Sequence, residues 1–191
     1  GAPLVRPLRP RARLAAANRI RASACSISQE TPVKRSLTEI HAIVSEAGLP
    51  EPDGFPTAAL MASIAKAEGG DPDAWVEHDP PTNPKAGPSS GLYQVNRASW
   101  PEIYNQTEKV RLAPLSDRDK ILAMTLLVRP ILADAWAAAL GAQRTLAQRG
   151  IQGGPLQVGL FVNAAWQAGA DNVAFWARRT RTGDPREIVN P

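Results

Sequence analysis

Apolar residues recur at three- and four-residue intervals over most of the chain, which is the spacing that places them on one face of an α-helix. In segment 36–48, Ser36 and Glu39 also have the spacing of a capping box. A second segment, 57–68, follows Pro56, a residue suited to the first helical position, and ends at two glycines. The residues expected on the two buried faces are Leu37, Ile40, Ile43, Val44 and Ala47, then Leu60, Met61, Ile64 and Ala67.

The second half of the chain repeats this pattern. Residues 116–148 are predicted to be mostly helical, with a break near Arg129 because the ring of Pro130 obstructs the preceding turn. Segment 156–169 and a shorter one that starts at Val173 complete the predicted helices. The residues expected on the buried face of segment 156–169 are Leu160, Phe161, Ala164 and Ala168. The pattern as a whole predicts a mainly α-helical fold.

Residues 71–90 interrupt the helical pattern. They contain prolines that forbid a continuous helix, namely Pro72, Pro80, Pro81, Pro84 and Pro88. Residues 91–95 alternate imperfectly between apolar and polar side chains, which predicts a short strand or an extended loop. A helix then begins near Trp100, with Pro101 tolerated in its first turn. We therefore expect a small loop or hairpin region over 70–96, with a cleft between it and a helical body.

One carboxylate stands on the apolar face of the second predicted helix. Glu68 follows Ile64 by four residues, so both side chains point to the same side. Glu68 also falls at the helix C-terminus, where the helix dipole disfavours an anion. Burial and the dipole both oppose ionisation, so we expect a raised pKa, as a general acid near neutral pH requires. The alternative interpretation of these residues is a solvated glutamate at a frayed helix end.

Three blocks of sequence resemble a known family. Ala67–Gly70, followed by Gly91–Val95, resembles the Glu-Ser-Gly … Gly-Leu-Met-Gln-Ile pattern of soluble lytic transglycosylases, members of the lysozyme-like superfamily. Segment Ser90–Trp100 is also similar to the Gly-Arg-Tyr-Gln … Trp-Trp region of lambda-type phage endolysins. Asn163–Gly169 resembles the family motif Ala-Ala-Tyr-Asn-Ala-Gly. The blocks occur in the family's order within residues 36–179, and together they are more specific than any one alone.

The resemblance implies a mainly α, α+β lysozyme-like domain over 36–180 that cleaves the β-1,4 bond between N-acetylmuramic acid and N-acetylglucosamine in peptidoglycan. In that family a single glutamate, matched here by Glu68, protonates the leaving oxygen. It then accepts the proton of the sugar's own 6-hydroxyl, which attacks the anomeric carbon and gives an anhydro sugar. The residues implied in glycan binding are Tyr93, Gln94, Trp166 and Gln167. Trp166 and Gln167 replace the motif's Tyr and Asn, and an indole offers only an N–H. No metal or cofactor is implied.

Two other functions fit the same residues. A muramidase would use water and a second carboxylate, and the candidates in the loop are Asp71, Asp73, Glu77 and Asp79. For each of them a solvated loop position is the alternative. A catalytically weak structural component of a virion or a secretion machine is the third possibility, since the last motif is altered and the chain begins with an unusual basic arm.

Tryptophan supplies flat faces on which sugars stack. Trp75, Trp100, Trp166 and Trp176 are candidates for the walls of a glycan cleft. Ordinary core packing is the alternative for each of them.

Charge is concentrated at the N-terminus. Residues 1–35 hold eight basic side chains and one acidic one, a net charge of +7, whereas the whole chain carries +4, so the remaining residues carry −3. Prolines and mutually repelling arginines predict an extended arm over 1–35. Such an arm suits a polyanion, namely nucleic acid, anionic lipid or an acidic protein surface, and a solvated tail is the alternative. Residues 181–191 are predicted to form a basic tail.

The remaining composition bears on compartment and metal chemistry. Cys25 is the single cysteine, so no internal disulfide forms. No apolar run reaches membrane-spanning length, and the longest run in the arm, Leu14–Ala17, is too short for a signal peptide. We expect action on the bacterial cell wall in the periplasm, with delivery by a phage virion as the favoured route. The two histidines, His41 and His78, lack the spacing of a structural zinc site.

Overall fold

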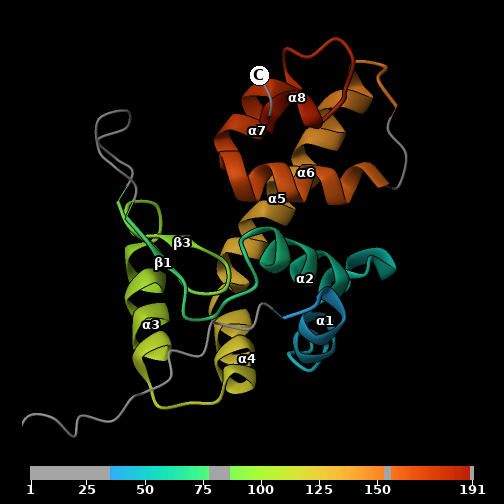
Figure 1. Cartoon of the computed structure of the whole chain (residues 1–191). Coiled ribbons are helices and arrows are strands. Elements are labelled where there is room, and N and C mark those ends of the chain that lie inside the picture. The colour runs from blue at the N-terminus through green and yellow to red at the C-terminus, as the bar shows by residue number, and fades with distance from the viewer. Residues whose placement is uncertain (1–34, 78–86, 153–155, 190–191) are drawn as a thin grey trace, which may run out of the picture. The chain divides into compact units, whose positions relative to one another are not determined.

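The computed structural model describes residues 35–77, 87–152 and 156–189, and within these ranges it contains eight α-helices, one short 3-10 helix and a small sheet (Figure 1). The α-helices are α1 Leu37–Ser45, α2 Thr57–Ala67, α3 Pro101–Leu112, α4 Asp117–Leu127, α5 Arg129–Gln148, α6 Leu156–Ala168, α7 Ala170–Ala177 and α8 Arg186–Val189, and the 3-10 helix is Pro52–Gly54. The prediction of a mainly helical fold with a small hairpin region is therefore confirmed.

The helical ends follow local rules. At the start of α1 the capping box is present, because the Ser36 hydroxyl accepts from the Glu39 N–H at 3.3 Å and the Glu39 carboxylate accepts from the Ser36 N–H at 2.8 Å. Helix α2 ends in a Schellman motif, in which the Gly70 N–H donates to the Ala65 carbonyl at 2.9 Å. Gly69, at φ 111°, reverses the chain between them. The two predicted helices thus end close to where the sequence indicates.

The predicted break between α4 and α5 is also confirmed. Val128 separates the two helices, Pro130 lies in the first turn of α5, and the axes are bent by 47°. Among the described helices none alone is long and apolar enough to cross a membrane.

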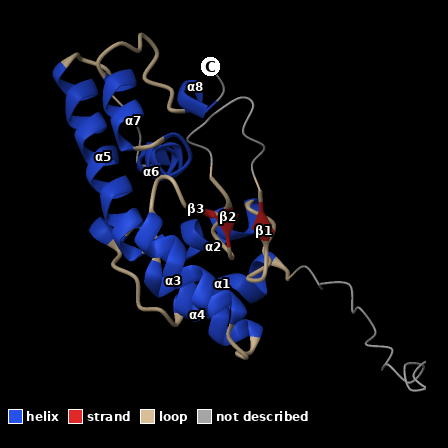
Figure 2. Cartoon of the chain, turned by 90° about the vertical axis from the view of Figure 1, so that its left-hand side faces the viewer, coloured by secondary structure: helices blue, strands red, loops and turns tan. Residues whose placement is uncertain are grey.

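Three short strands, β1 Trp75–Val76, β2 Ser89–Ser90 and β3 Val95–Asn96, form an antiparallel sheet in the order β1-β2-β3. Trp75 pairs with Ser90, and Ser90 pairs with Val95. The sheet packs on α3 through β2 and β3 (Figure 2).

The predicted strand or extended loop over 91–95 is wrong for its first four residues, which form a tight turn between β2 and β3. Gly91 has φ 72° and Gln94 has φ 47°, and the Gln94 N–H donates to the Gly91 carbonyl at 3.1 Å. Left-handed backbone at both ends of the segment cannot continue a strand. Only Val95 belongs to one.

The core lies where helices from both halves of the chain meet. Helix α5 packs against α6 and α7, while α1 packs against α2 and α4 (Figure 2). The largest fully buried side chains include Ile40, Met61, Leu92, Tyr93, Ile121, Met124 and Phe161. Two of these, Leu92 and Tyr93, come from the turn, so the turn is inserted into the core beside α4 rather than lying on the surface.

Three residues predicted to be buried are exposed. Ala67, at the last position of α2, is exposed where the helix ends. Leu37 is 46% exposed because it occupies the first turn of α1, where no other helix covers it. Leu160 is 41% exposed, although Phe161 and Ala164 on the same helix are buried as predicted. Periodicity identifies a face of a helix but not how far neighbouring elements extend over it.

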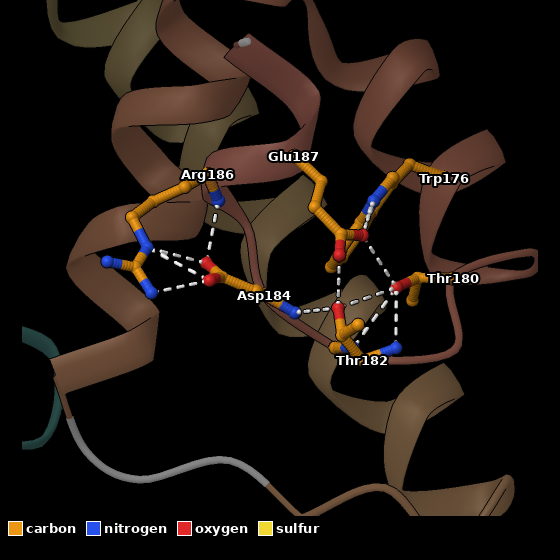
Figure 3. A network of polar contacts seen from close by, with 7 residues as sticks. Trp176, Thr180, Thr182, Asp184, Arg186 and Glu187 are labelled. Atoms are coloured by element: carbon orange, nitrogen blue, oxygen red, sulfur yellow. Dashed lines mark hydrogen bonds and ion pairs between the residues drawn. The ribbon is translucent and has the colours of Figure 1, made fainter. Parts of the chain in front are cut away.

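The predicted C-terminal tail, 181–191, is part of the folded unit as far as residue 189. Helix α8 packs against α6 and α7. Figure 3 shows the polar network at its base, in which the Glu187 carboxylate accepts from the hydroxyls of Thr182 at 2.5 Å and Thr180 at 3.1 Å, and from the Trp176 indole N–H at 3.3 Å. The segment is held by specific contacts that its basic composition does not reveal.

At the other end, Arg35, the first described residue, makes contacts with the helices. Arg35 donates from Nη2 to Asp117 Oδ2 at 3.0 Å, and its carbonyl accepts from Lys66 Nζ at 2.8 Å. Arg35 therefore belongs to the helical unit. The rest of the predicted arm lies outside the described residues.

Candidate functional site

A cavity of about 350 Å³ opens where the C-terminal end of α2, the turn before β3 and the end of α6 meet. Five of its lining residues are those that the sequence singled out, namely Glu68, Tyr93, Gln94, Trp166 and Gln167. They come from three blocks that are far apart in the chain. The fold therefore brings all five predicted site residues together around one hollow.

Glu68 is placed by the end of α2. It is the C-cap residue, its backbone N–H donates to the Ile64 carbonyl at 3.0 Å, and its side chain is half-buried. Because the next two residues turn the chain away, its carboxylate stands at the cavity wall and at the negative end of the helix dipole. The raised pKa that we expect for Glu68 stays a prediction.

Gln94 is held in an unusual backbone conformation. Its φ of 47° makes it the only non-glycine residue with positive φ in the described part of the chain. Its side-chain Nε2 donates to the Gly91 carbonyl at 2.9 Å, so the amide is folded back over the turn. A non-glycine residue in this region is strained, and such residues gather at functional sites.

Tyr93 forms a wall of the cavity rather than a free hydrogen-bonding group. It is 2% exposed, and its hydroxyl shares a 2.8 Å hydrogen bond with Thr125 Oγ1 on α4. Burial raises the pKa of Tyr93 well above its ordinary value of 10.0, against a smaller lowering by the Thr125 hydrogen bond, so the phenol stays protonated. What it presents to the cavity is ring surface.

The third block lies at the C-terminal end of α6. Trp166 is half-buried and Gln167 is exposed. Gly169, at φ 90°, then ends α6 and starts α7. The indole and the amide thus line the cavity from the end of α6, together with Glu68 and Gln94.

The cavity is also lined by residues outside the five that were predicted to act on or bind the glycan. Val95, Asn96, Ser99, Trp100 and Ile131 complete its lining. The Asn96 side chain links two backbone segments of the wall. Its Nδ2 donates to the Gly87 carbonyl at 2.8 Å, and its Oδ1 accepts from the Ala98 N–H at 2.9 Å. Its position just after Val95 in a Gly-Leu-Tyr-Gln-Val-Asn run could have indicated it. Nothing in the sequence indicates Ile131, which reaches the site from α5.

The candidate tryptophans separate into two groups. Trp100 and Trp166 line the cavity, whereas Trp75 and Trp176 do not. The Trp75 indole N–H donates to the Tyr104 hydroxyl at 3.1 Å, and Trp176 packs against Phe161 with ring centroids 5.6 Å apart. Trp75 therefore joins the sheet to α3, and Trp176 joins α7 to α6.

Asp71 and Asp73, two of the loop carboxylates that the structure describes, make polar contacts outside the cavity. Asp71 Oδ1 accepts from the Asp73 N–H at 2.8 Å, and the Asp73 carboxylate pairs with Lys120 Nζ at 2.6 Å. Glu77 is exposed, and Asp79 and His78 lie outside the described residues. Within residues 35–77, 87–152 and 156–189, no group of three or more His, Cys, Asp or Glu side chains could hold a metal ion.

No protein-family model, no curated protein and no solved structure matches this chain.

Proposed function

We propose that the chain is a peptidoglycan lytic transglycosylase with a lysozyme-like fold and with Glu68 as its single acid and base. The observation that carries this proposal is the convergence on one cavity of Glu68, Gln94 and Trp166. They belong to three blocks whose order matches the family motifs. A helical unit with a small antiparallel sheet beside the cavity is compatible with that fold.

The chemistry follows from the position of the carboxylate. Protonated Glu68 donates its proton to the glycosidic oxygen as the bond from that oxygen to the anomeric carbon breaks. The resulting Glu68 carboxylate stabilises the oxocarbenium-like sugar and then accepts the proton of the 6-hydroxyl, whose oxygen bonds to the anomeric carbon. The products are a 1,6-anhydro end and a free 4-hydroxyl, and no water is consumed. The amides of Gln94 and Gln167 and the Trp166 ring bind the sugars.

A muramidase is the close alternative. It needs a second carboxylate to activate water or to act as a nucleophile. The pairing of Asp73 with Lys120 and the exposure of Glu77 favour the single-carboxylate reaction. A structural virion or secretion component is the more distant alternative. In the proposed setting the domain acts on the bacterial cell wall in the periplasm, carried there by a phage virion. The partners proposed for the basic arm are an acidic protein surface or nucleic acid.

The test is digestion of purified peptidoglycan by the wild-type protein and by Glu68→Gln, with the products analysed by mass. The substitution keeps size and polarity but removes the transferable proton. Anhydro-muramyl ends formed by the wild type and lost in Glu68→Gln are the expected result. Glu51→Gln, at an exposed carboxylate before the 3-10 helix, is the matched control and should cleave normally. Reducing ends would indicate a muramidase, and an absence of products would overturn the proposal.

A further inference from the structure

Two larger grooves adjoin the cavity. Groove A, of about 800 Å³, has lining residues from α2, α5 and α6 and from the segment before α2, among them Phe55, Leu60, Ser63, Trp136, Leu160, Asn163 and Gln167. Groove B, of about 650 Å³, lies at the start of α3, the end of α4 and the start of α5, and its lining includes Pro101, Gln106, Leu126 and Pro130. Both grooves share lining residues with the cavity.

The shared residues show where each groove adjoins the cavity. Gln167 lines the cavity and groove A, and Ala67, beside Glu68, also lines groove A. Ser99 and Trp100 line the cavity and groove B. Gln167 and Trp100 therefore stand where the cavity that holds Glu68 adjoins two different grooves.

The lining suits a sugar chain. Most of the side chains that line groove A are apolar, including Phe55 and the largely buried Trp136, and Ser63, Gln143, Asn163 and Gln167 add hydroxyl and amide groups. Sugars carry apolar ring faces and hydroxyl edges, so they are matched by aromatic surface with a few amides and hydroxyls around it. In groove B the face of Trp100 and the amide of Gln106 offer the same combination.

We propose that one glycan strand lies across both grooves with the cleaved bond at Glu68, so that the protein cuts within strands rather than removing units from their ends. This inference rests on the proposed function. A site that binds only a terminal unit gathers its binding energy on one side of the broken bond. Here binding surface lies on both sides, so internal bonds of long strands are the preferred targets.

The experiment uses long peptidoglycan glycan strands that carry a fluorescent label at one end. Products are separated by size at early times, and their new ends are identified by mass. Cutting within strands predicts labelled products of broadly distributed length from the first time point. Release of anhydro-disaccharides alone from the first time point would overturn the inference while leaving the transglycosylase proposal intact. An absence of cleavage would overturn both.

Single substitutions at exposed positions test the grooves separately. Leu160→Trp obstructs groove A and Gln106→Trp obstructs groove B, and neither residue lines the cavity. We expect each to lower kcat/KM on long strands about tenfold, the change that corresponds to a modest loss of binding contacts. The matched controls are Asp134→Trp on α5 and Asn105→Trp on α3, exposed residues outside both grooves. Unchanged kcat/KM in both groove variants, with normal folding, would contradict the placement of the strand across both grooves.

Discussion

The ring of Trp166 meets the ring of Tyr93 edge to face, with centroids 5.8 Å apart and planes inclined at 62°. The contact joins α6 to the turn between β2 and β3, whose residues lie far apart in the chain. The Tyr93 hydroxyl is hydrogen-bonded to Thr125 of α4, so the indole packs on a side chain that is itself held in place.

This contact predicts a graded response at residue 166. Trp166→Phe keeps a ring against Tyr93, whereas Trp166→Ala removes it and should lower the free energy of unfolding by about 2–3 kcal/mol. Both should raise KM for glycan, the alanine variant more, because the stacking surface is lost. Chemical denaturation and digestion kinetics measure the two effects. Trp75→Ala, at a half-exposed ring outside the cavity, is the control and should leave KM unchanged. Equal KM values for Trp166→Ala and wild type would contradict the binding role.

The conformation of Gln94 separates stability from activity. Gln94→Gly relieves the positive φ but loses the hydrogen bond to Gly91, so the free energy of unfolding should stay within about 1 kcal/mol of wild type. Gln94→Ala keeps the strain and loses the bond, and it should be less stable than Gln94→Gly by about 1 kcal/mol. Both should cleave glycan at least about tenfold more slowly if the amide binds substrate. A fully active Gln94→Gly would show that the amide only supports the turn.

Gly91 is expected to be intolerant of any side chain. Its φ is 72°, and an added Cβ would lie 2.6 Å from Thr107 Cγ2 and 2.9 Å from Met124 Sδ. Gly91→Ala should therefore destabilise the protein by more than about 2 kcal/mol, measured by thermal or urea unfolding. Gly141→Ala, where nothing lies within 4 Å of the added atom in the interior of α5, should instead stabilise by about 0.5–1 kcal/mol. A native-like Gly91→Ala would contradict the close packing of the turn on α3 and α4.

Glu108 is expected to make stability depend on pH. Hydrogen bonds from Arg111, at 2.7 and 2.9 Å, lower the pKa of Glu108 below its ordinary value of 4.5, burial opposes them, and a hydrogen bond from Ser90 adds to the lowering. A carboxylate with a lowered folded-state pKa stabilises the protein above the unfolded value and loses that contribution as pH falls through the folded value. Unfolding should therefore become easier below about pH 4.5 in the wild type.

The variant Glu108→Gln should lose less stability than the wild type between about pH 7 and pH 3, as measured by urea unfolding at each pH. Glu102→Gln, an exposed residue in the first turn of the same helix, should keep the wild-type dependence. Identical acid sensitivity in wild type and Glu108→Gln would show that other groups govern it.

Thr180 tests whether the C-terminal segment contributes to folding. Its buried hydroxyl donates to Glu187 and accepts from the Gly183 N–H at 3.0 Å. Thr180→Val keeps the shape but leaves these partners unsatisfied, and it should lower the free energy of unfolding by about 1–3 kcal/mol. Thr145→Val, whose hydroxyl donates to the Gly141 carbonyl of its own helix, should change stability much less. Equal stability of both variants would show that the contacts of residues 181–189 do not stabilise the folded protein.

Much of the fold could be predicted because it depends on neighbours in the chain. The capping box at Ser36, the glycine pair after Glu68 and the break at Pro130 each involve contacts within a few residues, and all three lie close to where they were expected. The proximity of Glu68, Gln94 and Trp166 could be predicted only from a resemblance to a family. No local sequence pattern relates residues so far apart in the chain.

The rest was decided by packing between distant elements. Leu160 has the periodicity of a core residue, yet it lines groove A because no element covers that part of α6. Gln94 adopts positive φ because Leu92 and Tyr93 beside it are inserted against α4, which forces the turn. The position of Ile131 in the cavity wall and the hydrogen bonds of Glu187 likewise depend on packing between distant elements. Sequence by itself determined helices, caps and breaks, whose energies are local, whereas burial, strain and the cavity depend on which surfaces meet, and only the tertiary structure decided that.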